Sequence, residues 1–168
     1  GIDANAPLAA QLFGGAGIDY QKRYGIDDST FAAISVKARR HAANNPFAVF
    51  REPLSLEQVM QSPHLYGPIT RYQACPPTCG AAAAVVVSAA FAARNGLNAG
   101  VEIKAQAMTT DFAGTFEDHS MMRLVGYDMA REAARRVYEA AGVGPQDVQV
   151  VELHDCFTPN ELISYEAL

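Results

Sequence analysis

Residues 80–168 alternate between short apolar runs and helix-like segments, and this alternation constrains the fold more than any other feature. The runs at 81–87, 101–108 and 148–153 each fit a β-strand, since the first is short and apolar and the other two have a strand-like pattern. After the first run, Ser88 could cap a short helix that Gly96 ends. A loop-like stretch at 109–126 follows the second run, and an amphipathic helix closed by Gly142 is expected over 128–142. The order β-α-β-α-β-α predicts an α/β fold with parallel crossovers.

Residues 1–72 have a different character and read mainly as helices and loops. A helix is expected over 7–24, interrupted by "GGAG" at 14–17 and ended by Gly25. The stretch "DDSTFAAISVKARRHAANNP" starts with acids and ends with bases, which suits the dipole of a second helix. In "LSLEQVMQSP", Ser55 is the expected N-cap of a third.

The charge balance excludes some classes of function. The net charge is -5 and the pI about 5.3, so no basic excess points to nucleic acid or to an anionic membrane. No apolar run approaches the roughly 18 residues of a membrane-spanning helix. At 49% hydrophobic and 18% charged residues, the composition is globular, with enough chain for a core.

The cysteines do not form a disulfide framework or a metal site. There are three, Cys75, Cys79 and Cys156, and an odd, sparse set favours a reducing compartment. Cys75 and Cys79 are separated by three residues rather than the two of a zinc knuckle, and "HDC" at 154–156 lacks zinc-ligand spacing. We therefore expect no metal.

The turn "HDCF" at 154–157 lies between the last predicted strand and the last predicted helix. Thr158 and Glu161 have the spacing of a capping box, and Pro159 suits the first helical position. A helix is therefore expected to begin at about Pro159. Turns at the carboxyl ends of strands are where ligand sites gather in open α/β sheets.

Three versatile side chains occupy this turn. Cys156 precedes the helix N-terminus, where the helix dipole is expected to pull the thiol pKa toward neutrality. His154 is two residues away, so both side chains could share a face, with Asp155 pointing inward as a structural anchor. The alternative is an inert buried cysteine beside a histidine that only satisfies its own hydrogen bonds.

The segment "VVELHDCFTPNELISYEAL" closely resembles the HDCF segment of sterol-carrier-protein-type thiolases. The segments "QLFGGAG", "HAANNPFAVF" and "GAAAAVVVSAAFAARNGL" follow the order of that family too. The resemblance implies a thiolase-like α/β fold of two similar halves with a loop domain, of which this chain is an internal fragment. Residues 1–72 would be the helix-rich part of the first half with the loop domain, 73–98 its last strand and helix, and 99–168 the start of the second half.

The resemblance also implies an activity and residue roles. The family performs thiolysis or Claisen condensation of 3-oxoacyl-CoA, as in fatty-acid β-oxidation or sterol side-chain degradation, with coenzyme A as substrate and no bound cofactor. Cys156 would be the acid/base and His154 part of an oxyanion hole, while Asp155 and Phe157 would be structural. Cys75 matches a serine that lies against the pantetheine arm.

Two basic residues are candidates for contacts with coenzyme A. Lys37 and Arg40 lie with His41 on one face of a predicted helix, where they could meet the phosphates as loop-domain bases can in this family. A solvated basic face is the competing interpretation.

Two catalytic parts of the family are not found in these 168 residues: the nucleophilic cysteine and the histidine of a G-H-P segment. We therefore expect residues 1–168 alone to be inactive in thiolysis. One alternative function is a carbon–carbon lyase, a retro-aldolase of steroid side-chain degradation with an OB-fold partner. Another is a non-catalytic lipid-transfer protein. The resemblance further implies a homodimer or homotetramer, in a bacterial cytoplasm or a eukaryotic peroxisome.

Overall fold

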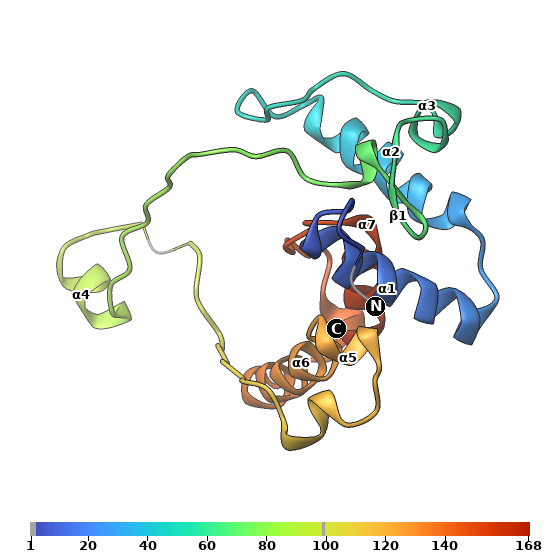
Figure 1. Cartoon of the computed structure of the whole chain (residues 1–168). Coiled ribbons are helices and arrows are strands. Elements are labelled where there is room, and N and C mark those ends of the chain that lie inside the picture. Colours follow the sequence, from blue (N-terminus) through green and yellow to red (C-terminus); the bar gives the residue numbers. More distant parts are fainter. Residues whose placement is uncertain (1–2, 99) are drawn as a thin grey trace.

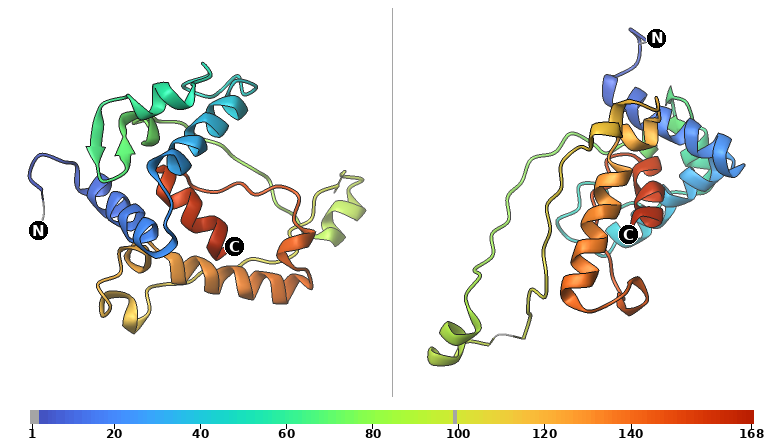
Figure 2. Two further views of the ribbon diagram at one scale, coloured as in Figure 1. Left: turned by 90° about the vertical axis from the view of Figure 1, so that its right-hand side faces the viewer. Right: turned by 90° about the horizontal axis from the view of Figure 1, so that it is seen from below.

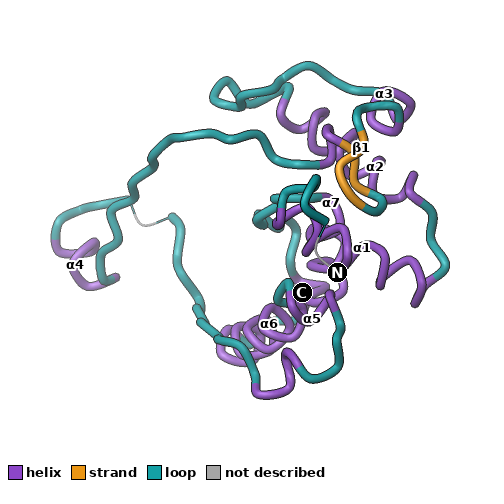
Figure 3. Tube along the Cα trace, in the orientation of Figure 1, coloured by secondary structure: helices purple, strands orange, loops and turns teal. Residues whose placement is uncertain are grey.

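Helices make up most of the regular structure in the computed structural model, which describes residues 3–98 and 100–168 (Figures 1 and 3). The α-helices are α1 (Leu8–Tyr24), α2 (Asp28–Ala42), α3 (Leu56–Met60), α4 (Ala89–Arg94), α5 (Met121–Leu124), α6 (Tyr127–Ala141) and α7 (Thr158–Ala167). Short 3-10 helices span Arg71–Gln73, Ala113–Phe116 and Pro145–Asp147. The strands β1 (His64–Tyr66) and β2 (Ile69–Thr70) form an antiparallel hairpin, which is the only sheet within the described ranges.

Several helix ends lie where the sequence predicts them. Gly25 and Gly142 close α1 and α6 in the left-handed conformation, with φ of 68° and 69°. Ser55 caps α3 through a reciprocal capping box with Gln58, and the Ser88 hydroxyl accepts a hydrogen bond from the Phe91 N–H at 3.2 Å. These caps satisfy backbone groups that no intrahelical partner reaches, so they fix the helix boundaries locally.

The predicted interruption of the first helix at "GGAG" is wrong, because α1 runs unbroken through residues 14–17. The glycines allow the hairpin segment to lie close to the helix backbone. A Cβ on Gly14 would lie 2.8 Å from the carbonyl oxygen of Tyr66, and one on Gly17 would lie 2.8 Å from Pro68 Cγ. The hairpin therefore packs against the backbone of α1, and this contact offsets the poor helix propensity of glycine.

Replacing Gly14 by alanine is expected to destabilise the protein by about 1–3 kcal/mol, because the clash with the Tyr66 backbone outweighs the gain in helix propensity. Gly15→Ala is the matched control. Its Cβ would meet only the flexible side chain of Met121, at 3.1 Å, so its effect should be neutral or stabilising. Urea unfolding of both variants measures the difference, and equal stabilities would contradict the packing of the hairpin on α1.

The three strands predicted at 81–87, 101–108 and 148–153 are wrong as assigned, since none joins a ladder in the described structure. Residues 77–98 and 100–112 instead leave the helical body as two long arms that carry α4 at their far end (Figures 1 and 2). Val85 and Val101 are each 93% exposed. A strand forms only when a neighbour accepts its backbone hydrogen bonds, and these segments have none among the described residues. The architecture is therefore mixed helical with a small hairpin, compatible with part of an α/β protein.

Helix α7 lies at the centre of the packed body. It packs against α1, α2 and α6, while α1 also packs against α5. Ala16 and Tyr20 of α1 form a core cluster with Met122 and Ile163. None of the described helices combines the length and the apolar character that crossing a membrane requires. The central position of α7 fixes the turn that precedes it, residues 154–157.

Candidate functional site

The "HDCF" turn is held by contacts with two distant segments. Ala74 and Phe157 form an isolated antiparallel bridge, and the Cys75 N–H donates to the Cys156 carbonyl oxygen at 2.9 Å. The Phe157 ring stacks on that of Phe13 from α1, with centroids 5.2 Å apart. Residues 74–75, which precede the first arm, therefore lie directly beside the turn.

Helix α7 begins one residue earlier than predicted and without the expected capping box. The two side chains that would have formed the box are engaged elsewhere. The Thr158 hydroxyl accepts a hydrogen bond from Gln73 Nε2 at 3.1 Å, and Glu161 forms an ion pair with Lys37 of α2. Tertiary partners have thus replaced the local cap, while the Asn160 side-chain amide steadies the turn by donating to the His154 carbonyl at 2.7 Å.

Cys156 is buried, with only 8% of its surface exposed. Burial raises the pKa of its thiol to about 11, with a smaller contribution from the nearby Cys75. The expectation of a pKa pulled toward neutrality is therefore wrong. Desolvation of a thiolate outweighs the dipole of a helix whose first turn is one residue away. At neutral pH the Cys156 sulfur holds its proton.

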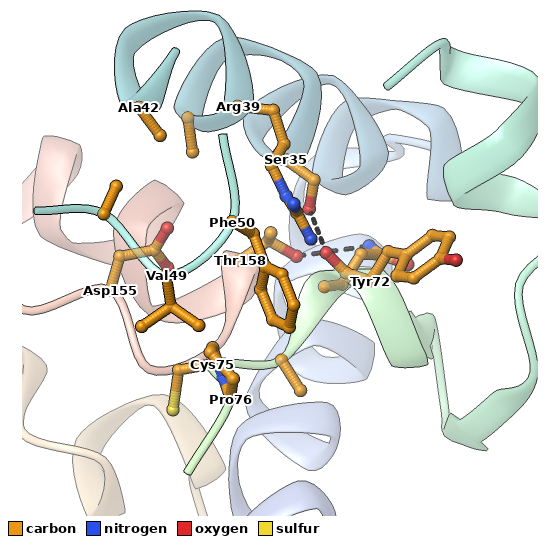
Figure 4. Close-up of a pocket in the computed structure, with 14 residues that line it drawn as sticks. Ser35, Arg39, Ala42, Val49, Phe50, Tyr72, Cys75, Pro76, Asp155 and Thr158 are labelled. Atoms are coloured by element: carbon orange, nitrogen blue, oxygen red, sulfur yellow. Dashed lines mark hydrogen bonds between the residues drawn. The ribbon is translucent and has the colours of Figure 1, made fainter. Parts of the chain in front are cut away.

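His154 and Cys156 do not share an environment. His154 is exposed, whereas Cys156 is buried, although only one residue separates them. Between them, Asp155 is partly buried and lines the cleft described below (Figure 4). The turn thus presents an exposed imidazole, a partly buried carboxyl group beside the cleft and an enclosed thiol.

Asp155 belongs to a cluster of ionisable groups between α2 and α7. Glu161 is almost fully buried and pairs with the Lys37 ammonium and the Tyr165 hydroxyl. Burial, with the hydrogen bond to Glu161, raises the pKa of Asp155 to about 7. The pKa of Glu161 is lowered, since Lys37, Tyr165 and Asp155 all hydrogen-bond to its carboxylate and overcome its burial. Asp155 Oδ1 is buried and finds no hydrogen-bond partner in the described part of the chain.

Asp155→Asn is expected to stabilise the protein above neutral pH. A carboxyl whose pKa is raised in the folded state binds its proton more tightly there, so its stabilising contribution is present below pH 4 and is lost as pH rises through about 7. Asparagine keeps the neutral form at every pH. The variant should match wild type near pH 4 and exceed it by roughly 2–4 kcal/mol at pH 8.

Urea unfolding of both proteins from pH 4 to 8 tests this expectation. The exposed Asp111→Asn is the control, and its difference from wild type should not grow across that range. A constant difference for Asp155→Asn would show that Asp155 is ionised in the folded protein near pH 4.

A cleft of 280 Å³ opens beside the turn, between α2 and residues 72–76 (Figure 4). Cys75 and Asp155 both line it. The Arg39 guanidinium lies 4.6 Å from the Phe50 ring centroid and 6.0 Å from that of Tyr72, which holds this cation in the cleft. A larger cleft of 1040 Å³ adjoins it and adds Arg51 and Arg71 to the lining.

The predicted basic pair, Lys37 and Arg40, does not line this cleft. Lys37 pairs with Glu161, and Arg40 is exposed on α2. The basic residue of α2 that reaches the cleft is Arg39, which sequence reasoning missed. A usable signal existed, because the cleft-lining residues of α2 have helical i, i+3, i+4, i+7 spacing: Ser35, Ala38, Arg39 and Ala42.

Known proteins similar to this chain fall into two groups, those named as sterol carrier or lipid-transfer proteins and those named for thiolase activity. A family model described as "Thiolase C-terminal domain-like" matches residues 113–168. "Sterol carrier protein 2" of Rattus norvegicus is 48% identical over 163 residues, covering 96% of this chain and 30% of that protein. "Non-specific lipid-transfer protein-like 2" of Caenorhabditis elegans is 39% identical over 165 residues, covering 97% of this chain and 40% of that protein.

The second group is named for thiolase activity. "Benzoylsuccinyl-CoA thiolase subunit BbsB" of Thauera aromatica is 37% identical over 150 residues, covering 89% of this chain and 38% of that protein. The chain thus spans between 30% and 40% of the length of these curated relatives. The similarity extends over nearly all of the chain, including both segments that meet at the Ala74–Phe157 bridge.

Proposed function

Because the chain belongs to the thiolase-related family of sterol carrier protein 2, we propose that Cys156 transfers a proton in the thiolytic cleavage of a 3-oxoacyl-CoA. One observation carries this proposal: the buried Cys156 opposes Cys75 beside the Ala74–Phe157 bridge, and Cys75 lines a cleft that also contains Arg39. Relatives named as a CoA thiolase and an acetyl-CoA acetyltransferase support the reaction class. The thiolase-like fold of the whole protein is part of the same proposal.

The raised pKa of Cys156 suits the cleavage direction. In this proposal a nucleophilic thiol elsewhere in the complete polypeptide attacks the third carbon of the 3-oxoacyl-CoA and keeps the acyl group as a thioester, which free CoA then takes over. The bond between the second and third carbons breaks, and the second carbon of the resulting acetyl-CoA enolate must take up a proton. A sulfur with a pKa of about 11 holds a proton at neutral pH and can donate it to that carbon from Sγ. In the condensation direction the resulting thiolate removes the proton again.

The other predicted site residues take supporting roles in this proposal. The exposed His154 would donate a hydrogen bond to the thioester oxygen as negative charge develops there. Cys75 would lie against the pantetheine arm. Arg39, Arg51 and Arg71 replace Lys37 and Arg40 as candidates for the phosphates of coenzyme A, because they line the two adjoining clefts.

Lipid binding is the second candidate function. It is favoured by relatives named as sterol carrier and non-specific lipid-transfer proteins. The retro-aldolase alternative, its OB-fold partner, the homodimer or homotetramer and the cellular location stay predictions from the sequence.

An assay on the complete natural polypeptide that carries residues 1–168 separates these functions. The proposal predicts CoA-dependent cleavage of a medium-chain 3-oxoacyl-CoA, with acetyl-CoA as one product. Cleavage of a 3-hydroxyacyl-CoA without free CoA would indicate the lyase instead. Transfer of a fluorescent sterol between vesicles, with no turnover of either thioester, would contradict catalysis and favour lipid binding.

A further inference from the structure

The backbone bridge beside the "HDCF" turn sets two cysteines opposite one another. Ala74 pairs with Phe157 in antiparallel register, so the next residue of one segment, Cys75, opposes the preceding residue of the other, Cys156. The hydrogen bond from Cys75 N–H to the Cys156 carbonyl belongs to the same register. Directly opposed side chains in an antiparallel pair project from the same face.

The spacing of such a pair is close to that of a disulfide. Cys75 and Cys156 make one of the two hydrogen bonds of a hydrogen-bonded antiparallel pair. In a regular pair of that kind the Cα atoms lie about 5.5 Å apart and the Cβ atoms about 4.5–5.5 Å apart. A disulfide joins Cα atoms about 4.4–6.8 Å apart and Cβ atoms about 3.5–4.5 Å apart. Closure therefore needs the Cβ atoms to approach by about 1 Å, and the segment from Cys75 onward, which belongs to no helix or strand up to residue 88, can supply that movement.

The two thiols differ in their access to solvent. Cys75 is exposed and free, so a small oxidant can reach its sulfur. Cys156 is free and buried, and unlike Cys75 it is not among the residues that line the cleft. This is the arrangement of a thiol that reacts first and a second thiol that resolves the product.

We infer that Cys75 and Cys156 form a reversible disulfide when the protein meets a peroxide. The peroxide oxidises the Cys75 sulfur to a sulfenic acid and is itself reduced to water. The Cys156 sulfur then attacks that sulfur, its thiol proton is released, and the hydroxyl group leaves as a second water. A dithiol reverses the change by returning two electrons and two protons.

The disulfide would remove the proton of Cys156 and tie residues 74–75 to the turn. It would therefore switch off the proton transfer, a consequence that rests on the proposed function, whereas the disulfide itself does not. The attacking species is the thiolate, and the pKa of Cys156 is raised to about 11, so closure should become faster as pH rises from 7 toward 10.

Peptide mapping of the complete natural polypeptide tests the inference without any activity measurement. The folded protein is treated with a small excess of hydrogen peroxide, its remaining thiols are alkylated, and it is digested with trypsin without reduction. We expect the peptide 72–94, which holds Cys75 and Cys79, to be joined to the peptide that begins at residue 137 and holds Cys156. The mass of the joined species should be about 2 Da below the summed masses of the two separate peptides, and dithiothreitol should release both peptides.

Two variants identify the sulfur. Cys79→Ser should still form the joined peptide, whereas Cys75→Ser should form none, and a urea-unfolded sample should give a mixture of pairings. Linkage through Cys79 in the folded protein, or separate oxidation of Cys75 and Cys156, would overturn the inference. If the disulfide forms but neither redox state cleaves a 3-oxoacyl-CoA, the proposed function fails and the thiol pair stands.

Discussion

Replacing Cys156 by serine is expected to lower kcat for 3-oxoacyl-CoA cleavage about 10³-fold in the complete natural polypeptide, within the roughly 10²–10⁴ range of general acid–base catalysis. A serine hydroxyl fills nearly the same space but is a far weaker proton-transfer group at this position. KM should change little, because the substitution removes a group that acts on the reacting carbon and leaves the cleft lining intact.

The matched control is Cys79→Ser, which makes the same replacement of sulfur by oxygen at an exposed cysteine. It should leave kcat within about twofold of wild type. Equal unfolding midpoints for the two variants would show that the loss is chemical. A Cys156→Ser protein that keeps its kcat would remove the thiol from the mechanism and leave it as a buried packing residue.

Replacing Lys37 by methionine is expected to cost about 2–4 kcal/mol of stability at pH 7, the second large effect. The Glu161 side chain is only 6% exposed, so its carboxylate loses its cationic partner where water cannot replace it. The double variant Lys37→Met/Glu161→Leu should recover part of the loss, because no buried charge then remains.

Lys104→Met supplies the contrast on the same chain. The side chains of the Lys104–Glu102 pair are 66% and 71% exposed. Breaking this pair should therefore lower the free energy of unfolding by less than about 0.5 kcal/mol. Urea unfolding at pH 7 compares the variants. If Lys37→Met and Lys104→Met cost the same, the ion pair with Glu161 does not anchor α7 to α2.

Features encoded within a few neighbouring residues could be predicted from the sequence. Ser55 and Ser88 cap helices with their own hydroxyls, and Gly25 and Gly142 end helices because glycine adopts positive φ without strain. The position of Cys156 shortly before a helix was also predictable.

Features that depend on distant partners could not be predicted. The pKa of Cys156 depends on how fully the fold buries it. The expected capping box does not form because Thr158 bonds to Gln73 and Glu161 pairs with Lys37, and both partners are far away in the sequence. Residues 81–87 and 101–108 do have the residue pattern of strands. A ladder also needs a neighbouring strand to pair with, and the local residue pattern does not specify that neighbour. The pairing of Cys75 with Cys156 likewise spans two segments whose register only the structure defines.

Exchange of the methyl protons of acetyl-CoA with deuterium tests most directly whether Cys156 moves a proton at the carbon beside a thioester. The complete natural polypeptide is incubated with acetyl-CoA in D₂O and the acetyl signal is followed by proton NMR, a half-reaction that does not require cleavage of a carbon–carbon bond. We predict that wild type and Cys79→Ser catalyse exchange, and that Cys156→Ser lowers its rate by about 10²-fold or more. Exchange at the same rate in Cys156→Ser would contradict the account.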